Sequence, residues 1–139
     1  MVATVQDYMV SDVETLTPED SLETAVMLER RLRIRHIPIL ERGELVGMVT
    51  DRDLKRALPS PVTGTDQQTF EQVVQTTRLA QIMTRSPATI SPTAPLRDAV
   101  QLLCEKRFGA LPVVEKGKLV GIITGVDMLR AFLTFLDNA

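Results

Sequence analysis

The 139-residue chain has few of the side chains that build covalent or metal-held scaffolds. It contains one cysteine, Cys104, one histidine, His36, and no tryptophan. A single cysteine excludes an internal disulfide framework and a cysteine-rich zinc site. A single histidine excludes metal centres that need two. We expect Cys104 to be a small buried thiol in a helix and His36 to line a cleft or pack in the core, because neither has a partner that would make it a nucleophile or a base.

The chain also lacks an excess of charge of one sign and long apolar runs. Sixteen basic and 18 acidic side chains give a net charge of −2, which provides no electrostatic footprint for duplex nucleic acid. No apolar run approaches the roughly 18 residues that span a bilayer, and residues 1–9 lack a signal-peptide pattern. No phosphate-binding loop or dinucleotide fingerprint is present. We therefore expect a cytoplasmic protein without a duplex nucleic-acid partner, membrane contact or catalytic activity.

The strongest feature of the sequence is an internal repeat. A shift of 74 positions aligns the two halves without a gap, with pairs such as Met9 and Met83, Pro38 and Pro112, and Gly47 and Gly121. Two copies of one supersecondary unit are expected to pack with pseudo-two-fold symmetry and to cover each other's apolar faces. We divide the chain into repeat 1 over 1–60, a linker with a short helix over 61–78, and repeat 2 over 79–139.

Each repeat has the same predicted order of elements. Apolar residues at helical spacing predict helices over 22–32 and 96–103, and we expect Asp20 to cap the first. Two apolar runs joined by a glycine-containing turn follow each helix, over 37–49 and 111–123, and are typical of a β-hairpin. A further helix begins near Thr50 and near Thr124, and brief strands precede the first helices, over 14–16 and 88–90. The fold class is α/β (α+β mixed), with two β-α-β-β-α repeats. Phe70, Val73 and Val74 predict the linker helix.

A motif of glycine, two apolar residues, threonine, two variable residues and aspartate occurs in each repeat, over 47–53 and 121–127. One interpretation is helix capping, with threonine at the N-cap and aspartate at the third helical position. The other is ligand binding. A helix start attracts phosphate, threonine adds a hydroxyl donor, and an aspartate one turn later accepts hydrogen bonds from a ribose diol. By spacing alone, capping is the simpler interpretation.

Taken twice, this pattern resembles the CBS domain in its usual tandem pair, the Bateman module. The resemblance extends from about Val5 to Leu133 and rests on residues 37–39 and 111–113, the glycine turns, and the paired motif. It implies clefts between the repeats that bind adenosine compounds such as AMP, ADP, ATP or S-adenosylmethionine. It also implies that Asp53 and Asp127 hold ribose, and that Thr50 and Thr124 hold phosphate.

The resemblance further implies which residues share a cleft. The first would combine Thr50, Arg52 and Asp53 with Ala88, Thr89, Arg107, Ala110 and Leu111. The second would combine Thr124 and Asp127 with Glu14, Thr15, Arg33, His36 and Ile37. We expect the second to be the better phosphate site, because it would also receive Arg35. Asp51 and Asp53 could contact magnesium carried by a bound nucleotide, but two carboxylates alone do not make a metal site.

The leading hypothesis is a regulatory module that senses an adenosine-containing ligand and needs no obligatory cofactor. The alternative is a structural module for dimerisation or protein interaction, with clefts that bind nothing. The two differ on whether Asp53 and Asp127 matter beyond helix capping. The resemblance implies a disc-like homodimer with helices at its interface, and a regulated protein partner that the sequence does not identify.

Overall fold

The computed structural model describes residues 2–60, 66–106 and 108–139 of the chain, which form two compact units. Unit 1 comprises Met1–Val13 and Pro87–Ala139, and unit 2 comprises Glu14–Ser86. Each unit holds the helices and hairpin of one repeat together with the segment that precedes the first helix of the other repeat. We call this the leading segment; it comprises residues 2–13 in unit 1 and residues 79–86 in unit 2. The compact units are therefore cut differently from the sequence repeats.

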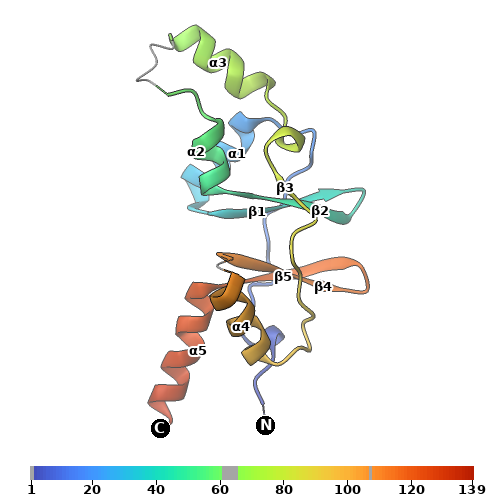
Figure 1. Cartoon of the computed structure of the whole chain (residues 1–139), viewed down its shortest axis with the longest axis vertical. Helices are drawn as coiled ribbons and strands as arrows, with labels where there is room; N and C mark the ends of the chain where they lie inside the picture. Colours follow the sequence, from blue (N-terminus) through green and yellow to red (C-terminus); the bar gives the residue numbers. More distant parts are fainter. Residues whose placement is uncertain (1, 61–65, 107) are drawn as a thin grey trace. The chain divides into compact units, whose positions relative to one another are not determined.

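The two units contain matching elements, labelled in Figure 1. Unit 2 contains α1 (Leu22–Leu32), β1 (His36–Glu41), β2 (Glu44–Thr50), α2 (Asp51–Ala57), α3 (Gln67–Thr76), the short 3-10 helix η3 (Leu79–Gln81) and β3 (Thr84–Arg85). Unit 1 contains the 3-10 helix η1 (Val5–Asp7), α4 (Leu96–Lys106), β4 (Ala110–Glu115), β5 (Lys118–Thr124) and α5 (Gly125–Asp137). The mixed α/β class, the hairpins, both helices of each repeat and the linker helix are confirmed.

Both hairpins close through a two-residue turn. Arg42 and Gly43 have φ values of 53° and 82°, and the equivalent Lys116 and Gly117 have 52° and 78°. Two successive positive φ values belong to the type I′ turn, whose twist matches that of paired strands. The expected strands over 14–16 and 88–90 shrink to single parallel bridges, Leu16 to Ile39 and Ile90 to Val113.

One helix cap differs from the sequence prediction. The hydroxyl of Ser21 accepts a hydrogen bond from the Thr24 N–H at 3.2 Å, which makes Ser21 the N-cap of α1. Asp20 accepts from the Thr17 N–H instead, at 2.7 Å. The prediction of Asp20 as the cap was wrong by one residue, because this carboxylate closes the turn that precedes the helix.

The leading segment of each unit lies against a glycine of the hairpin. In unit 1, Val10 and Ile122 exchange two backbone hydrogen bonds of 2.9 Å, and in unit 2, Thr84 pairs with Met48. A Cβ atom on Gly121 would lie 2.8 Å from the Val10 carbonyl oxygen. Glycine is therefore needed here because the backbone of the leading segment passes so close.

Each unit has its own buried core. In unit 2, Leu22, Ile39, Val49 and Leu54 form a cluster that also takes in Val74 of α3. In unit 1, Val5 of the leading segment joins the cluster of Ile90, Ala99, Leu111, Val113 and Ile123. In each unit, the hairpin strands contribute apolar side chains to the core of that unit. The ends of the strands lie outside the core and can carry polar residues.

Candidate functional site

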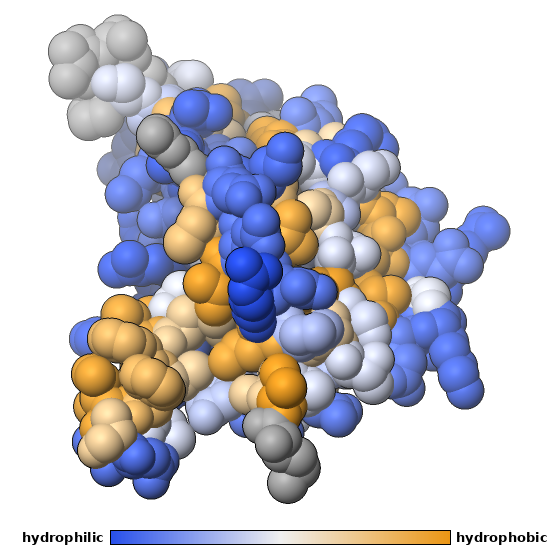
Figure 2. Space-filling view, turned by 60° about the horizontal axis from the view of Figure 1, so that its bottom comes forward, coloured by the Kyte–Doolittle hydropathy of each residue, from blue (hydrophilic) through white to orange (hydrophobic). Residues whose placement is uncertain are grey.

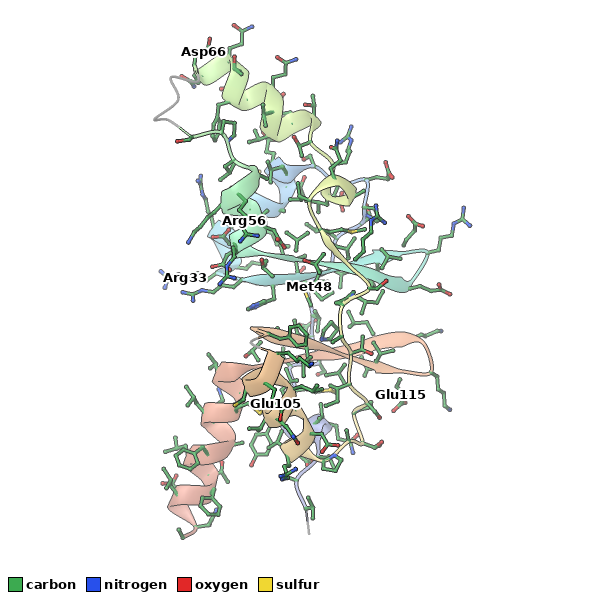
Figure 3. All side chains as sticks on the ribbon, viewed as in Figure 1. Arg33, Met48, Arg56, Asp66, Glu105 and Glu115 are labelled. Atoms are coloured by element: carbon green, nitrogen blue, oxygen red, sulfur yellow. The ribbon has the colours of Figure 1, made fainter. Side chains whose placement is uncertain are left out.

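The residues predicted for ligand binding in unit 2 gather at one end of its hairpin. His36 at the start of β1 is paired with Thr50 at the end of β2, and α2 begins at the next residue. Arg33 is labelled in Figure 3 and lies at the turn between α1 and β1. Its φ of 55° is left-handed. The segment containing Glu14 and Thr15 reaches this strand through the parallel bridge from Leu16 to Ile39.

Unit 1 repeats this arrangement. Ala110 is paired with Thr124 and Leu111 with Ile123, and Asp127 follows in the first turn of α5. Ala88 and Thr89 directly precede Ile90, which bridges to Val113. Arg107, also predicted for ligand binding, lies outside the described residues. The structure thus groups the predicted residues by unit, whereas the predicted clefts combine residues of both units.

The Thr50–Asp53 motif forms a reciprocal helix cap. The Thr50 N–H donates to Asp53 Oδ2 at 2.9 Å, and the Thr50 hydroxyl accepts from the Asp53 N–H at 3.1 Å. Asp53 is half-buried, and Arg52 beside it is exposed. Capping is therefore present, as the simpler interpretation predicts, and it occupies only one oxygen of the Asp53 carboxylate.

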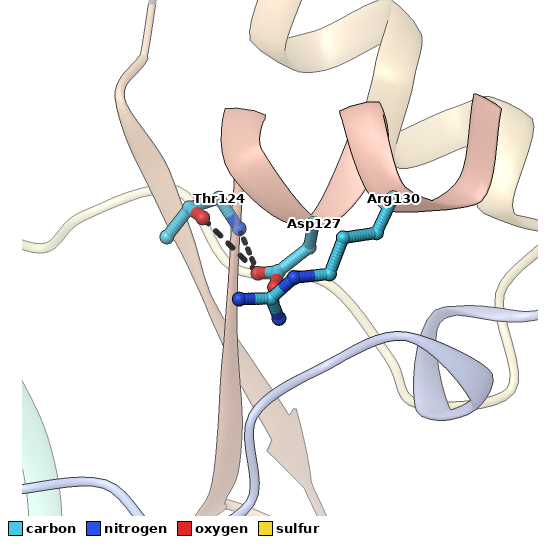
Figure 4. A network of polar contacts seen from close by, with 3 residues as sticks. All are labelled: Thr124, Asp127 and Arg130. Carbon is cyan, nitrogen blue, oxygen red and sulfur yellow. Dashed lines mark hydrogen bonds and ion pairs between the residues drawn. The ribbon is translucent and has the colours of Figure 1, made fainter. Parts of the chain in front are cut away.

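The Thr124–Asp127 motif has the same sequence pattern and different hydrogen bonds, shown in Figure 4. Asp127 Oδ2 accepts from the Thr124 N–H at 2.8 Å and from the Thr124 hydroxyl at 3.1 Å. Asp127 Oδ1 pairs with Arg130 Nη1 at 3.2 Å, and the aspartate side chain is 3% exposed. Arg130 is not among the residues predicted for the site, although an acidic and a basic residue three positions apart on a helix are a recognisable signal.

The charged groups around His36 have opposing effects on it. Burial of the imidazole lowers the pKa of His36, the negative charge of Asp51 raises it, and the positive charge of Arg35 lowers it further. The net effect is a lowered pKa, so the side chain is neutral at physiological pH. The Asp51 N–H donates to the Arg35 carbonyl at 3.0 Å, which holds this end of the hairpin against the start of α2.

The remaining chemical candidates are weak. Within the described residues, no group of three or more His, Cys, Asp and Glu side chains is placed to hold a metal ion. No helix in that part of the chain is long and apolar enough to cross a membrane. Cys104 is exposed, so the prediction of a buried thiol was wrong: it lies on the outward face of α4.

Three comparisons bear on the family. The family model of the CBS domain matches residues 5–60 and 79–134. A CBS domain-containing protein, YhcV from Bacillus subtilis, is 33% identical over 127 residues, which are 91% of this chain and 84% of that protein. The structure of CBSX2 in complex with AMP is similar with a TM-score of 0.78 and 30% identity, covering 95% of this chain and 97% of that one.

A structure of the CBS domain pair of protein MJ0100, in complex with 5-methylthioadenosine and S-adenosyl-L-methionine, is similar with a TM-score of 0.77. Its identity is 25%, and the match covers 94% of this chain and 99% of that one. The residues matched by the family model include both hairpins and both threonine–aspartate motifs. The chain therefore belongs to the CBS domain family and carries two copies of the domain.

Proposed function

We propose that this chain is a regulatory module that binds an adenosine-containing ligand, namely AMP, ADP, ATP or S-adenosylmethionine. The observation that carries the proposal is the half-buried Thr50–Asp53 motif at the start of α2, where one carboxylate oxygen of Asp53 stays free of its helix cap. The AMP complex of CBSX2 and the S-adenosyl-L-methionine complex of MJ0100 support this ligand class.

The proposal assigns a chemical task to each predicted group. Asp53 and Asp127 accept hydrogen bonds from ribose hydroxyls, which suits a carboxylate with two oxygens. Thr50 and Thr124 donate to phosphate, and Arg33 and Arg107 supply charge to it through a planar fork of donors. Backbone and apolar groups beside the first strand of each repeat hold the base. The remaining predicted residues line the proposed sites: Glu14, Thr15, His36, Ile37, Arg52, Ala88, Thr89, Ala110 and Leu111.

The proposal describes a sensor in the cytoplasm rather than an enzyme. Magnesium would enter only with a nucleotide, because the described residues offer no metal cluster of their own. Ligand binding changes the behaviour of a regulated protein only if the ligand binds one conformation of the module more tightly than another.

Calorimetric titration of nucleotide-free protein with the four ligands tests the proposal. We expect saturable binding of at least one ligand, and its loss in Asp53→Asn. Asp51→Asn is the matched control, because it neutralises a neighbouring carboxylate that has no role in the proposed ribose contact. If none of the four ligands binds, or if the two variants weaken binding equally, the proposal is wrong.

We further propose that the chain forms a homodimer through α5, as the family resemblance implies and as the alternative hypothesis of a dimerisation module also requires. Four large side chains recur on α5 at the spacing of one helix face, Leu129, Phe132, Leu133 and Leu136, and are 68%, 55%, 58% and 51% exposed. Figure 2 shows an orange apolar patch at the lower left, where α5 comes forward. An exposed helix face with four large apolar side chains is typical of a protein–protein interface.

In unit 2, a helix covers the apolar surface of α1, which corresponds to α4 in unit 1. There, α3 packs on α1, and its Val74 joins the cluster that contains Leu22 and Leu54. In unit 1, the groove between α4 and α5 is open and is lined by Leu96, Arg97, Val100, Met128, Leu129, Ala131 and Phe132. The 74-residue shift places Leu58 on Phe132, and Leu58 packs against its core while Phe132 is 55% exposed.

Sedimentation equilibrium tests the dimer. Leu129→Lys introduces the residue that repeat 1 carries at the equivalent position, Lys55, and we expect this variant to sediment as a monomer. Met27→Lys is the control, because Met27 is an exposed apolar residue of α1, 44% exposed, on the other unit. A wild-type monomer, or a dimer that survives Leu129→Lys, would contradict the proposal.

A further inference from the structure

The two threonine–aspartate motifs are alike in sequence and unequal in the groups they leave free. The Thr50 hydroxyl accepts from the Asp53 N–H, so its own hydrogen has no acceptor within the described residues. The Thr124 hydroxyl donates its hydrogen to Asp127 Oδ2. A donor for a ligand oxygen is therefore available at Thr50 and already used at Thr124.

The carboxylates of Asp53 and Asp127 also differ in the oxygen atoms that they leave free. Asp53 Oδ2 accepts one hydrogen bond from the Thr50 N–H, and no partner of Oδ1 lies in the described part of the chain. Both oxygens of Asp127 are engaged, Oδ2 by two donors of Thr124 and Oδ1 by Arg130 Nη1. A pair of ribose hydroxyls would find a free acceptor at Asp53, and at Asp127 it would have to displace the guanidinium.

Arg130 is placed to act as a removable cover. Its side chain is 67% exposed, while that of Asp127 is 3% exposed, so the ion pair joins a solvent-facing group to a buried one. The equivalent residue of repeat 1 is Arg56, which is exposed and forms no ion pair with Asp53 among the described residues. The cover thus exists in one repeat only.

We propose that Arg130 holds the Asp127 carboxylate closed to ligand, so that the chain binds one ligand through Thr50 and Asp53. A second binding site, at Asp127, opens only when Arg130 releases it. This inference rests on the proposed function and makes the two repeats unequal. It also reverses the order of the two sites expected from the distribution of cations in the sequence.

The test is calorimetric titration with AMP on four proteins. These are the wild type, Asp53→Asn, Asp53→Asn with Arg130→Gln, and this double variant with Asp127→Asn added. We expect one AMP per wild-type chain, and much weaker residual binding in Asp53→Asn. In the double variant we expect binding at least about tenfold tighter than the residual binding of Asp53→Asn, which is the lower end of the range for one hydrogen bond to a charged group. The triple variant should lose that gain.

Asp53→Asn with Arg56→Gln is the matched control and should bind no better than Asp53→Asn alone. Thermal unfolding of each variant shows that it is folded. The inference fails alone if the wild type binds two equivalent AMP molecules, if Asp53→Asn binds as tightly as the wild type, or if Arg130→Gln gives no gain in the double variant. If no protein of the series binds any of the four adenosine ligands, the proposed function fails, and the inference fails with it.

Discussion

Substitution of Gly121 by alanine tests how closely the leading segment of unit 1 packs on its hairpin. An alanine Cβ would lie 2.7 Å from Met9 Sδ and 2.8 Å from the Val10 carbonyl oxygen. The methionine side chain can move away, but the carbonyl cannot shift without weakening the two 2.9 Å hydrogen bonds between Val10 and Ile122. The structure therefore predicts a loss of stability that side-chain rearrangement alone does not relieve.

The size of the loss follows from two opposing effects. Overpacking costs about 1–3 kcal/mol, and the strained backbone hydrogen bonds add about 1 kcal/mol. Replacing glycine by alanine restricts the unfolded chain, which returns about 0.4–1 kcal/mol. We expect Gly121→Ala to lower the free energy of unfolding by about 1–3.5 kcal/mol.

Urea unfolding at 25 °C measures this loss, and two other glycines calibrate it. At Gly47 the nearest backbone atom, the Thr84 carbonyl oxygen, is 3.0 Å from the added Cβ, so Gly47→Ala should cost less than Gly121→Ala. Gly125 lies in the first turn of α5 with nothing within 4 Å of its Cβ, so Gly125→Ala should leave stability unchanged or raise it slightly. A Gly121→Ala protein within about 0.5 kcal/mol of wild type, the range of ordinary surface substitutions, would refute the reasoning.

Three further predictions follow from single contacts, each measured by urea unfolding. Val74→Ala should cost about 1.5 kcal/mol, because two buried methyl groups of α3 leave the unit 2 core; a smaller change than in exposed Phe70→Ala would contradict this. Thr50→Ala should cost about 1 kcal/mol, because the Thr50 hydroxyl accepts a hydrogen bond from the Asp53 N–H at the start of α2, and a stability equal to that of wild type would contradict this. The lowered pKa of His36 means that the unfolded chain binds the proton more tightly, so stability should fall as pH drops below about 6.5. His36→Gln should lose less stability than wild type between pH 7.5 and 5.5, and equal losses would exclude this role.

Local patterns in the sequence predicted most of the fold. The helix α1 follows from apolar residues at helical spacing, and the hairpins follow from a glycine-containing turn between two apolar runs. Both patterns act over a few residues, so they can be read without knowing the tertiary structure. The same holds for Thr50 as the start of α2, where a capping motif and a strand end coincide.

Features that depend on distant contacts were not predictable in the same way. Each leading segment packs on the hairpin of the other repeat, and in unit 1 this depends on the approach of Met9 to Gly121, more than 100 residues away. Sequence patterns do not report contacts between residues so far apart in the chain. The choice of Ser21 over Asp20 as a cap depends on a turn at Thr17 that uses the carboxylate. The three-residue spacing of Asp127 and Arg130 can be read from the sequence, but the burial of the Asp127 side chain cannot.

A crystal structure of the nucleotide-free protein soaked with AMP tests the central claim most directly. The account predicts a ribose hydroxyl within hydrogen-bond distance of Asp53 Oδ1, about 2.5–3.0 Å, with the Thr50 hydroxyl directed at the phosphate. An AMP molecule bound with its ribose away from Asp53, or saturating AMP with no bound nucleotide at either motif, would contradict it.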